Sequence, residues 1–286
     1  GVEFRKDYGK LGVLCATFPD IPVVAMTATA SLSDVAKIQE SLGLKKCKQV
    51  IGNPDRTNIF YRKVFRSGRD IDAIESILRP VANELLTLKL SLPLTIIYLP
   101  LRWCGFAYRL FESILSHKQY YPEGALAIPE NRMFAQFHAP QTEQMKVAIL
   151  RQMCSPNSIV RVIFATVAIG MGVDIPNIRQ IIHLSPPCSV KQYFQETGRA
   201  GRDGKQADAT LYYNNRDIAR NRVEMQNDMR EFCIQDKECL RKELLKSLDY
   251  VYDKKKNPLH LCCSACEKAC KCSKCLEQLI KDFQDL

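Results

Sequence analysis

Short apolar runs alternate along the chain with longer segments in which apolar residues recur at helical spacing. Short runs rich in Ile, Val, Leu and Phe are typical of strands that are buried on both faces of a parallel sheet. The runs cover residues 21–27, 47–51, 58–64, 94–99, 134–137, 160–164, 179–183 and 209–213. The helical spacing covers residues 31–44, 71–88, 103–115 and 141–153. The repeated strand–helix order predicts an α/β fold with a doubly wound parallel sheet.

The pattern changes after residue 214. Residues 215–252 are highly charged and have helical spacing, and the run Lys-Lys-Lys-Asn-Pro at 254–258 then breaks the pattern. A cysteine-rich segment follows, and residues 275–285 have the composition of a last short helix. We therefore expect a smaller helical unit after the sheet.

Charge adds a partner class to this picture. The chain of 286 residues has 41 Lys and Arg against 31 Asp and Glu, a formal net charge of +10. This excess indicates an anionic partner, with nucleic acid first and acidic lipid second. No apolar run approaches the ~20 residues that a membrane-spanning helix needs, so we expect no membrane span.

The thirteen cysteines are distributed unevenly. Five lie before residue 200 and are expected to be small core residues. Secreted disulfide scaffolds usually lack a long cysteine-poor α/β body, so a reducing compartment with a local metal site suits the pattern better. The other eight fall in the last fifth of the chain: Cys233, Cys239, Cys262, Cys263, Cys266, Cys270, Cys272 and Cys275.

Two arginines three residues apart, Arg199 and Arg202, lie in the glycine-rich run 192–204. A guanidinium group is always charged and presents a planar fork of donors that matches phosphate oxygens. Small neighbouring residues allow backbone and ligand to approach closely. This is the chemistry of an arginine finger, which neutralises a phosphoryl group during transfer. The alternative is a basic surface turn.

Residues 164–176 predict a strand end followed by a tight turn. Gly170 and Gly172 leave backbone N–H groups available for a phosphate or a DNA backbone. Asp174 can accept from a ribose hydroxyl or orient an arginine. We expect Thr166 and Asp174 to emerge at one edge of the cleft that the two arginines face. The alternative is an ordinary strand–loop–helix joint.

Residues 26–30, Met-Thr-Ala-Thr-Ala, place the hydroxyls of Thr27 and Thr29 at the carboxyl end of a predicted strand. Open α/β sheets bind ligands at this edge, where such hydroxyls can bond a phosphate or a carboxylate. Threonine is also common at strand ends that bind nothing.

In this order, the segments resemble the second half of a superfamily 2 helicase motor, and the RecQ family in particular. The resemblance runs from about residue 1 to residue 266. Its segments resemble motif III (26–30), motif IV (96–98 with Arg102), motif V (165–176), motif VI (193–204), the link between the motor lobes (53–59), the aromatic-His-Ala step (137–139) and the segment after Walker B (4–8). No Gly-x-x-x-x-Gly-Lys-[Ser/Thr] and no Asp-Glu-x-His occurs in the sequence. In the family those motifs supply the phosphate cradle and the Mg²⁺ ligands.

The resemblance implies a fragment in three parts. Residues 1–52 would be the C-terminal remnant of a first RecA-like lobe, residues 53–214 the second RecA-like lobe and residues 215–286 a helical zinc-binding module. The parent would be an ATP-dependent 3′-to-5′ DNA helicase of the nucleus, with a DNA single-strand/duplex junction and the missing first lobe as partners. We expect the chain alone to lack ATPase activity. The alternatives are a non-enzymatic nucleic-acid-binding remnant and a DEAD-box-like RNA helicase.

The resemblance also implies roles for single residues. ATP with Mg²⁺ would lie between two lobes, and the catalytic group would be Arg199, Arg202 and Gln195. The nucleotide-binding group would be Asp174, Gly172, Gly198, Thr27 and Thr29, of which the two threonines relay between the sites. The DNA-binding group would be Thr166, Gly170 and Arg102.

The cysteine cluster resembles the zinc module of RecQ helicases, which has one cysteine on a helix and three on a following loop. Four thiolates in tetrahedral geometry favour Zn²⁺ in a closed, structural site. The first choice of ligands is Cys239, Cys262, Cys263 and Cys266. Cys270, Cys272 and Cys275 leave alternatives open, since 272–275 is a second C-x-x-C: Cys270 replaces Cys262, a second ion binds, or the thiols are free or oxidised. We interpret His260 as a solvated loop histidine, with a surrogate ligand as the alternative.

Overall fold

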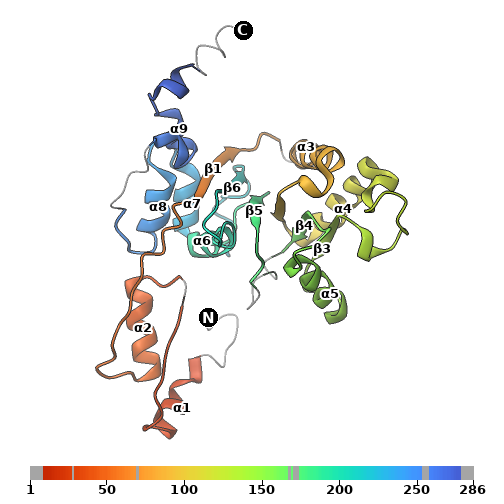
Figure 1. The fold of residues 1–286 in the computed structure, drawn as a ribbon. Helices are drawn as coiled ribbons and strands as arrows, with labels where there is room; N and C mark the ends of the chain where they lie inside the picture. The colour runs from red at the N-terminus through yellow and green to blue at the C-terminus, as the bar shows by residue number, and fades with distance from the viewer. Residues whose placement is uncertain are drawn as a thin grey trace.

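The computed structural model describes residues 9–27, 29–68, 71–166, 169, 174–252 and 258–277. Within these residues, six parallel strands form one sheet in the order β1-β6-β5-β2-β4-β3 (Figure 1). The strands are β1 (Ile59–Phe65), β2 (Leu94–Tyr98), β3 (Phe134–Phe137), β4 (Val162–Ala165), β5 (Ile178–His183) and β6 (Ala207–Tyr213).

Helices cover both faces of this sheet, because successive side chains of its central strands point to opposite sides. On β2, Ile97 packs with α3 (Ile71–Leu88) and α4 (Leu101–Leu115), whereas Ile96 packs with Met153 of α5 (Glu143–Cys154). All five residues of β2 are buried. A third buried cluster joins β1 and β6 to α6 (Val190–Thr197). The predicted doubly wound parallel sheet is therefore confirmed, with six of the eight predicted strands in place.

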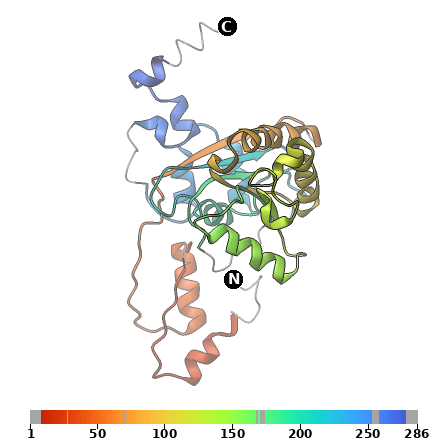
Figure 2. The ribbon, with the colours of Figure 1, turned by 45° about the vertical axis from the view of Figure 1, so that its right-hand side comes forward.

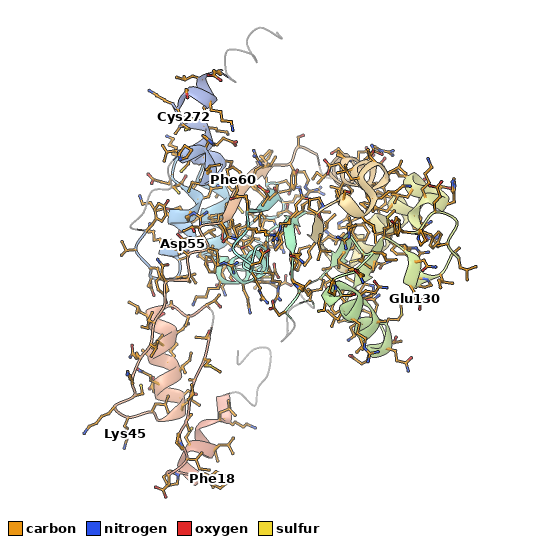
Figure 3. All side chains as sticks on the ribbon, viewed as in Figure 1. Phe18, Lys45, Asp55, Phe60, Glu130 and Cys272 are labelled. Carbon is orange, nitrogen blue, oxygen red and sulfur yellow. The ribbon has the colours of Figure 1, made fainter. Side chains whose placement is uncertain are left out.

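The predictions of strands at 21–27 and 47–51 are wrong. Neither segment pairs with another strand, and side chains such as Val24 (77% exposed) and Met26 (89% exposed) face solvent. A strand needs a neighbour for its backbone hydrogen bonds, and the described sheet offers none here. These segments belong to an N-terminal arm, residues 9–52, with α1 (Gly12–Thr17) and α2 (Leu32–Leu42) apart from the sheet (Figure 2). Figure 3 labels Phe18 and Lys45 near its far end.

A local signal does fix α2, which was predicted at 31–44. Ser31 and Asp34 form a capping box, in which each side chain accepts from the backbone N–H of the other. Gly43 ends the helix at a positive φ of 64°. The arm reaches α6 through an ion pair between Asp34 and Lys191.

A C-terminal module, residues 215–277, packs against β1 and α6. Its helices are α7 (Asn227–Ile234), α8 (Leu240–Lys246) and α9 (Ser264–Lys268), with a 3₁₀ turn, η5 (Leu259–Leu261). The prediction of helix throughout 215–252 is only partly right, since 215–226 forms turns. The reason lies in Arg230, whose guanidinium donates to the carbonyls of Ile218, Ala219, Arg222 and Met225 (2.6–3.3 Å). These bonds hold the turns around one guanidinium group, and the carbonyls of Ala219 and Arg222 also accept from the N–H three residues on, as turns do.

No described helix is long and apolar enough to cross a membrane.

Candidate functional site

Thr166 and Asp174, which stand on either side of the loop after β4, lie at different edges of the sheet. Thr166 directly follows β4 and its N–H donates to the carbonyl of Phe137 (3.2 Å), at the carboxyl edge. Asp174 precedes β5, and its carbonyl accepts from the thiol of Cys154 at the end of α5 (3.4 Å). Asp174 therefore lies at the amino edge. The prediction that Thr166 and Asp174 share one edge is wrong, because a connection between parallel strands must cross the sheet.

The amino edge brings together two of the predicted residues. Arg202 Nη1 lies 2.5 Å from Asp174 Oδ1, and the side chains are 38% and 77% exposed. The turn that carries Arg202 is tied to the same edge, because the Gly201 N–H donates to the carbonyl of Ile178 (2.9 Å). Gln195 is exposed on α6, which leads into this turn. The arginine turn, residues 198–204, is thus a surface feature of the amino edge.

Glycine is required at the centre of the arginine turn. Gly201 has a φ of +59°, a region that L side chains rarely adopt. A Cβ here would lie 2.4 Å from Asn58 Nδ2 and 2.7 Å from the carbonyl oxygen of Lys205. Both neighbours are fixed by hydrogen bonds, so a larger residue would displace the turn.

Arg199 lies in a different setting from Arg202. It is only 7% exposed, beside Tyr98 at the end of β2. Burial, together with the nearby carboxylate of Glu196, raises the pKa of Tyr98, and the charge of Arg199 opposes that shift. Glu196 is itself held by His183 Nε2 (2.7 Å) and by Gln192 Nε2 (3.0 Å). The two arginines therefore do not face solvent as a pair in this structure.

The linker into the sheet, residues 53–58, fixes the arginine turn through hydrogen bonds to its backbone carbonyls. The guanidinium of Arg56 donates to the carbonyls of Gly198 (3.1 Å), Ala200 (3.1 Å) and Gly201 (2.6 Å). Asn58 Nδ2 also donates to the carbonyl of Gly201 (2.7 Å). Because these acceptors are backbone atoms, the contacts fix the course of the turn without involving the side chain of Arg202, which pairs with Asp174.

The linker is held in turn by Arg241 of α8, one of the most buried side chains of the chain. Its guanidinium pairs with Asp55 Oδ1 (2.6 Å) and donates to the carbonyls of Arg56 (2.8 Å) and Ile59. It also lies over the ring of Tyr61, 5.2 Å from the centroid. A continuous set of contacts thus runs from the C-terminal module through the linker to the arginine turn. Figure 3 labels Asp55 where the arm, the sheet and the module meet.

The carboxyl edge carries a basic pocket of about 410 Å³. Its lining comes from the segments after β2, β5 and β6: Pro100, Arg102, Ser185, Arg216, Asp217 and Arg222. The carboxylate of Asp217 is already paired with Arg66 (3.1 Å), so the three guanidinium groups leave the pocket positive. Such a pocket suits a phosphate group.

Four cysteines of the C-terminal module converge as predicted from their order. The sulfur atoms of Cys239, Cys262, Cys263 and Cys266 all lie within 4.8 Å of one another. Cys239 Sγ is 3.6 Å from Cys262 Sγ and 4.0 Å from Cys263 Sγ. Tetrahedral bonding to Zn²⁺ at about 2.3 Å would separate sulfur atoms by about 3.8 Å. This thiol group could hold a metal ion, and Cys270 does not belong to it.

The comparisons with known proteins agree with this geometry. Residues 115–204 match the family described as Helicase conserved C-terminal domain. The ATP-dependent DNA helicase Q1 of Pongo abelii is 30% identical over 280 residues, 95% of this chain and 39% of that protein. The ATP-dependent DNA helicase RecQ of Haemophilus influenzae is 34% identical over 222 residues, 77% of this chain and 31% of that protein. The chain belongs to the RecQ family of helicases.

This RecQ-family chain spans well under half the length of those two relatives. A solved structure of Mss116p bound to ssRNA and AMP-PNP has a TM-score of 0.55 with 12% identity, over 99% of this chain and 51% of that one. At that identity the likeness concerns the fold alone. It agrees with a RecA-like parallel α/β sheet, as predicted.

Other predicted residues of the RecQ-family motifs lie away from these groups or outside the described residues. Thr27 and Thr29 lie on the N-terminal arm, where the N–H of Thr29 donates to Thr27 Oγ1 (3.3 Å). Gly170 and Gly172 lie outside the described residues.

Sequence reasoning missed several residues that shape the site: Arg56, Asn58, Arg216, Arg222 and Arg241. Two of them, Arg56 and Asn58, stand in segment 53–59, which resembles the link between the motor lobes, and Arg241 stands two residues after Cys239. The charged run after β6 was the available signal for Arg216 and Arg222. None of these signals says which backbone carbonyls or pockets the guanidinium groups will reach.

Replacing Arg241 by alanine should lower the free energy of unfolding by about 3–5 kcal/mol, because it leaves the buried carboxylate of Asp55 without its partner. Urea unfolding followed by circular dichroism measures this. Arg79→Ala is the matched control, since Arg79 pairs with Glu75 on the exposed surface of α3 and should cost at most about 0.5 kcal/mol. Equal costs for the two variants would contradict a special role for Arg241.

Proposed function

We propose that this chain forms the second motor lobe and the zinc module of an ATP-dependent DNA helicase that unwinds DNA in the 3′-to-5′ direction. The observation that carries the proposal is the contact between Arg202 and Asp174 on the surface of the amino edge, with the arginine turn fixed by the linker. We divide the chain into residues 1–52, the remnant of a first lobe, 53–214, the second lobe, and 215–286, the module. The relatives are named as ATP-dependent DNA helicases, which supports ATP and DNA as ligands.

ATP with Mg²⁺ would lie against the amino edge, between this lobe and the missing first lobe. Arg202 is well placed for the γ-phosphate, because its guanidinium is at the surface and its present partner is a carboxylate that can bond a ribose hydroxyl instead. Gln195 and Gly198, at the end of α6, would line the same site. Arg199 would reach the nucleotide only by leaving the side of Tyr98.

Two further parts of the nucleotide proposal come from the motif resemblance alone. Gly172 would offer a backbone N–H to the nucleotide. Thr27 and Thr29, on the arm, would relay between nucleotide and DNA once the rest of the first lobe surrounds them. On its own the chain would not hydrolyse ATP, because its sequence holds no Walker A or Walker B residues.

DNA would run along the carboxyl edge. Thr166 and Gly170 would hold the backbone, and Arg102 with Arg216 would bind phosphates in the basic pocket. Contacts of this kind do not depend on base sequence and weaken with salt. The junction between single strand and duplex would lie where this edge meets the C-terminal module.

Zn²⁺ would bind the thiol group Cys239, Cys262, Cys263 and Cys266. With four protein ligands and no open position, the site would be structural. Its effect would reach the motor directly, because Cys239 caps the helix that carries Arg241. The N–H of Leu240 donates to Cys263 Sγ (3.4 Å), which favours the thiolate form that a metal ion requires.

The N-terminal arm would pack against the rest of the first lobe. Its exposed apolar side chains supply that surface: Leu11, Val13, Leu14, Phe18, Ile21, Val23, Val24 and Met26. We also propose a nuclear location, which agrees with a chain whose thirteen cysteines all lie in the described residues as free thiols.

Two alternatives make different predictions. A binding remnant without a motor would bind DNA with the same salt dependence and show no effect of ATP in the full-length parent. A DEAD-box-like RNA helicase would hydrolyse ATP with RNA rather than DNA as the stimulant. The RecQ relatives favour DNA.

In the full-length parent, Arg202→Ala should lower kcat of DNA-stimulated ATP hydrolysis by about 10³–10⁵-fold, the usual effect of losing an arginine finger. Binding of DNA without nucleotide should change less than about twofold, since Arg202 lies at the other edge. The exposed Arg109 of α4 provides the control, Arg109→Ala, with kcat near that of the unsubstituted protein. A kcat loss below tenfold for Arg202→Ala, or steady ATP turnover by the 286-residue chain alone, would contradict the proposal.

Substituting alanine for Arg102 or Arg216 should weaken binding of single-stranded DNA equally for all base sequences. Each variant should also reduce the slope of log K against log salt by about 1, because one phosphate contact is lost. Fluorescence anisotropy of a labelled oligonucleotide over a series of KCl concentrations gives the slope. Arg109→Ala is the control and should leave the slope unchanged. If Arg102→Ala and Arg216→Ala give the same slope as this control, the basic pocket does not bind DNA.

Replacing Cys263 by serine should remove about one zinc per chain and destabilise the C-terminal module. Metal content by mass spectrometry after gel filtration measures the first effect. Cys47→Ser, on the exposed arm, should leave the zinc content unchanged. Equal zinc in both variants would exclude Cys263 as a ligand.

A further inference from the structure

A second group of metal-binding side chains lies beyond the first, near the far end of the C-terminal module. It consists of His260, Cys270, Cys272 and Cys275, whose ligand atoms all lie within 4.8 Å of one another. Figure 3 labels Cys272, which lies well away from the sheet. This second group shares no residue with the first thiol group, so the two groups do not compete for ligands.

The distances match a tetrahedral site with three sulfur ligands and one nitrogen. His260 Nδ1 lies 3.6 Å from Cys270 Sγ and 3.3 Å from the sulfur atoms of both Cys272 and Cys275. With Zn–S at about 2.3 Å and Zn–N at about 2.0–2.1 Å, tetrahedral geometry separates sulfur from nitrogen by about 3.5 Å. The interpretation of His260 as a solvated loop residue is therefore wrong, since its ring nitrogen lies within 3.6 Å of three thiol sulfur atoms.

The local chain supports a cation rather than a hydrophobic core at this place. Cys270 is buried, but its described neighbours towards the C-terminus are mostly exposed, including Leu276 (48%). Three exposed lysines, Lys268, Lys271 and Lys274, alternate with the cysteines. Three thiolates and a neutral imidazole around Zn²⁺ carry a net charge of −1, which these lysines would stabilise.

We infer that His260, Cys270, Cys272 and Cys275 bind a second Zn²⁺, separate from the four-cysteine site. Thiolate and imidazole ligands favour zinc over Mg²⁺ or Ca²⁺, and four protein ligands leave no position for catalysis. The site is structural: its ion would connect His260 of η5 to the three cysteines and so hold residues 270–277 against η5. Since His260 stands on the same 3₁₀ turn that leads into Cys262, the two ions would fix both ends of α9.

The metal would replace the apolar packing that the end of the module lacks. Binding free energy at such a site becomes folding free energy, because the ligands are not held together in the unfolded chain. The inference does not depend on the helicase proposal, since it rests on residues distant from both edges of the sheet. A helicase without this ion would still have the first thiol group and the buried contacts of Arg241.

The test is the zinc content of the purified 286-residue chain and of matched variants. We expect two zinc ions per chain, and one in the double variant Cys272→Ser/Cys275→Ser and in His260→Ala. Cys47→Ser should retain two. His260→Cys should also retain two, because a thiolate can take the place of the imidazole, and this rescue separates loss of a ligand from failure to fold.

A second readout uses trypsin, which cleaves after lysine. In the zinc-loaded chain, Lys271 and Lys274 lie within the metal loop and should resist cleavage, whereas the double variant should be cut there while the sheet remains intact. One zinc in the unsubstituted chain would overturn the inference. Two zinc ions in His260→Ala, or a disulfide among Cys270, Cys272 and Cys275 found by mass spectrometry under non-reducing conditions, would overturn it as well.

Discussion

The buried guanidinium of Arg241 is the interaction on which the arrangement of this chain depends. It contacts Asp55 and the Arg56 carbonyl of the linker, and the Ile59 carbonyl and the ring of Tyr61 in β1. The C-terminal module, the linker and β1 therefore all contact one guanidinium group. A charge this deeply buried is tolerated only when it is paired and hydrogen-bonded, so removing one of these partners would be costly. The linker then passes the constraint to the arginine turn through Arg56.

Residues that are close together in one sequence motif lie at opposite edges of the parallel sheet. Thr166 and Asp174 stand eight positions apart, yet they lie at opposite edges because the chain must cross the sheet between parallel strands. The nucleotide and DNA surfaces that we propose are therefore the two edges of one sheet. Arg199 connects them physically: its backbone belongs to the arginine turn, and its side chain lies beside Tyr98 at the carboxyl end of β2.

The C-terminal module is stabilised by a buried cluster that its helices share with the sheet. Its inner part shares a buried cluster with β1 and α6, and the thiol group sits within that cluster. Its outer part has no comparable apolar contacts among the described residues, and the second zinc ion that we propose would stabilise that part instead. The N-terminal arm is the opposite case, because its apolar side chains are exposed and no metal-binding group lies among its described residues.

The sequence by itself determined the six strands of the sheet. A strand that is buried on both faces has a continuous apolar run, such as Leu94–Tyr98, which is visible in the sequence alone. It also determined α2, through the capping box at Ser31. Only the tertiary structure decided that residues 21–27 form no strand, because a strand depends on hydrogen bonds to a neighbour that the run itself does not specify. The same holds for the carbonyls that Arg230 and Arg241 reach, and for His260 among the thiols of Cys270, Cys272 and Cys275. Contacts between residues far apart along the chain are set by the packing of whole elements, which leaves no pattern in the local sequence.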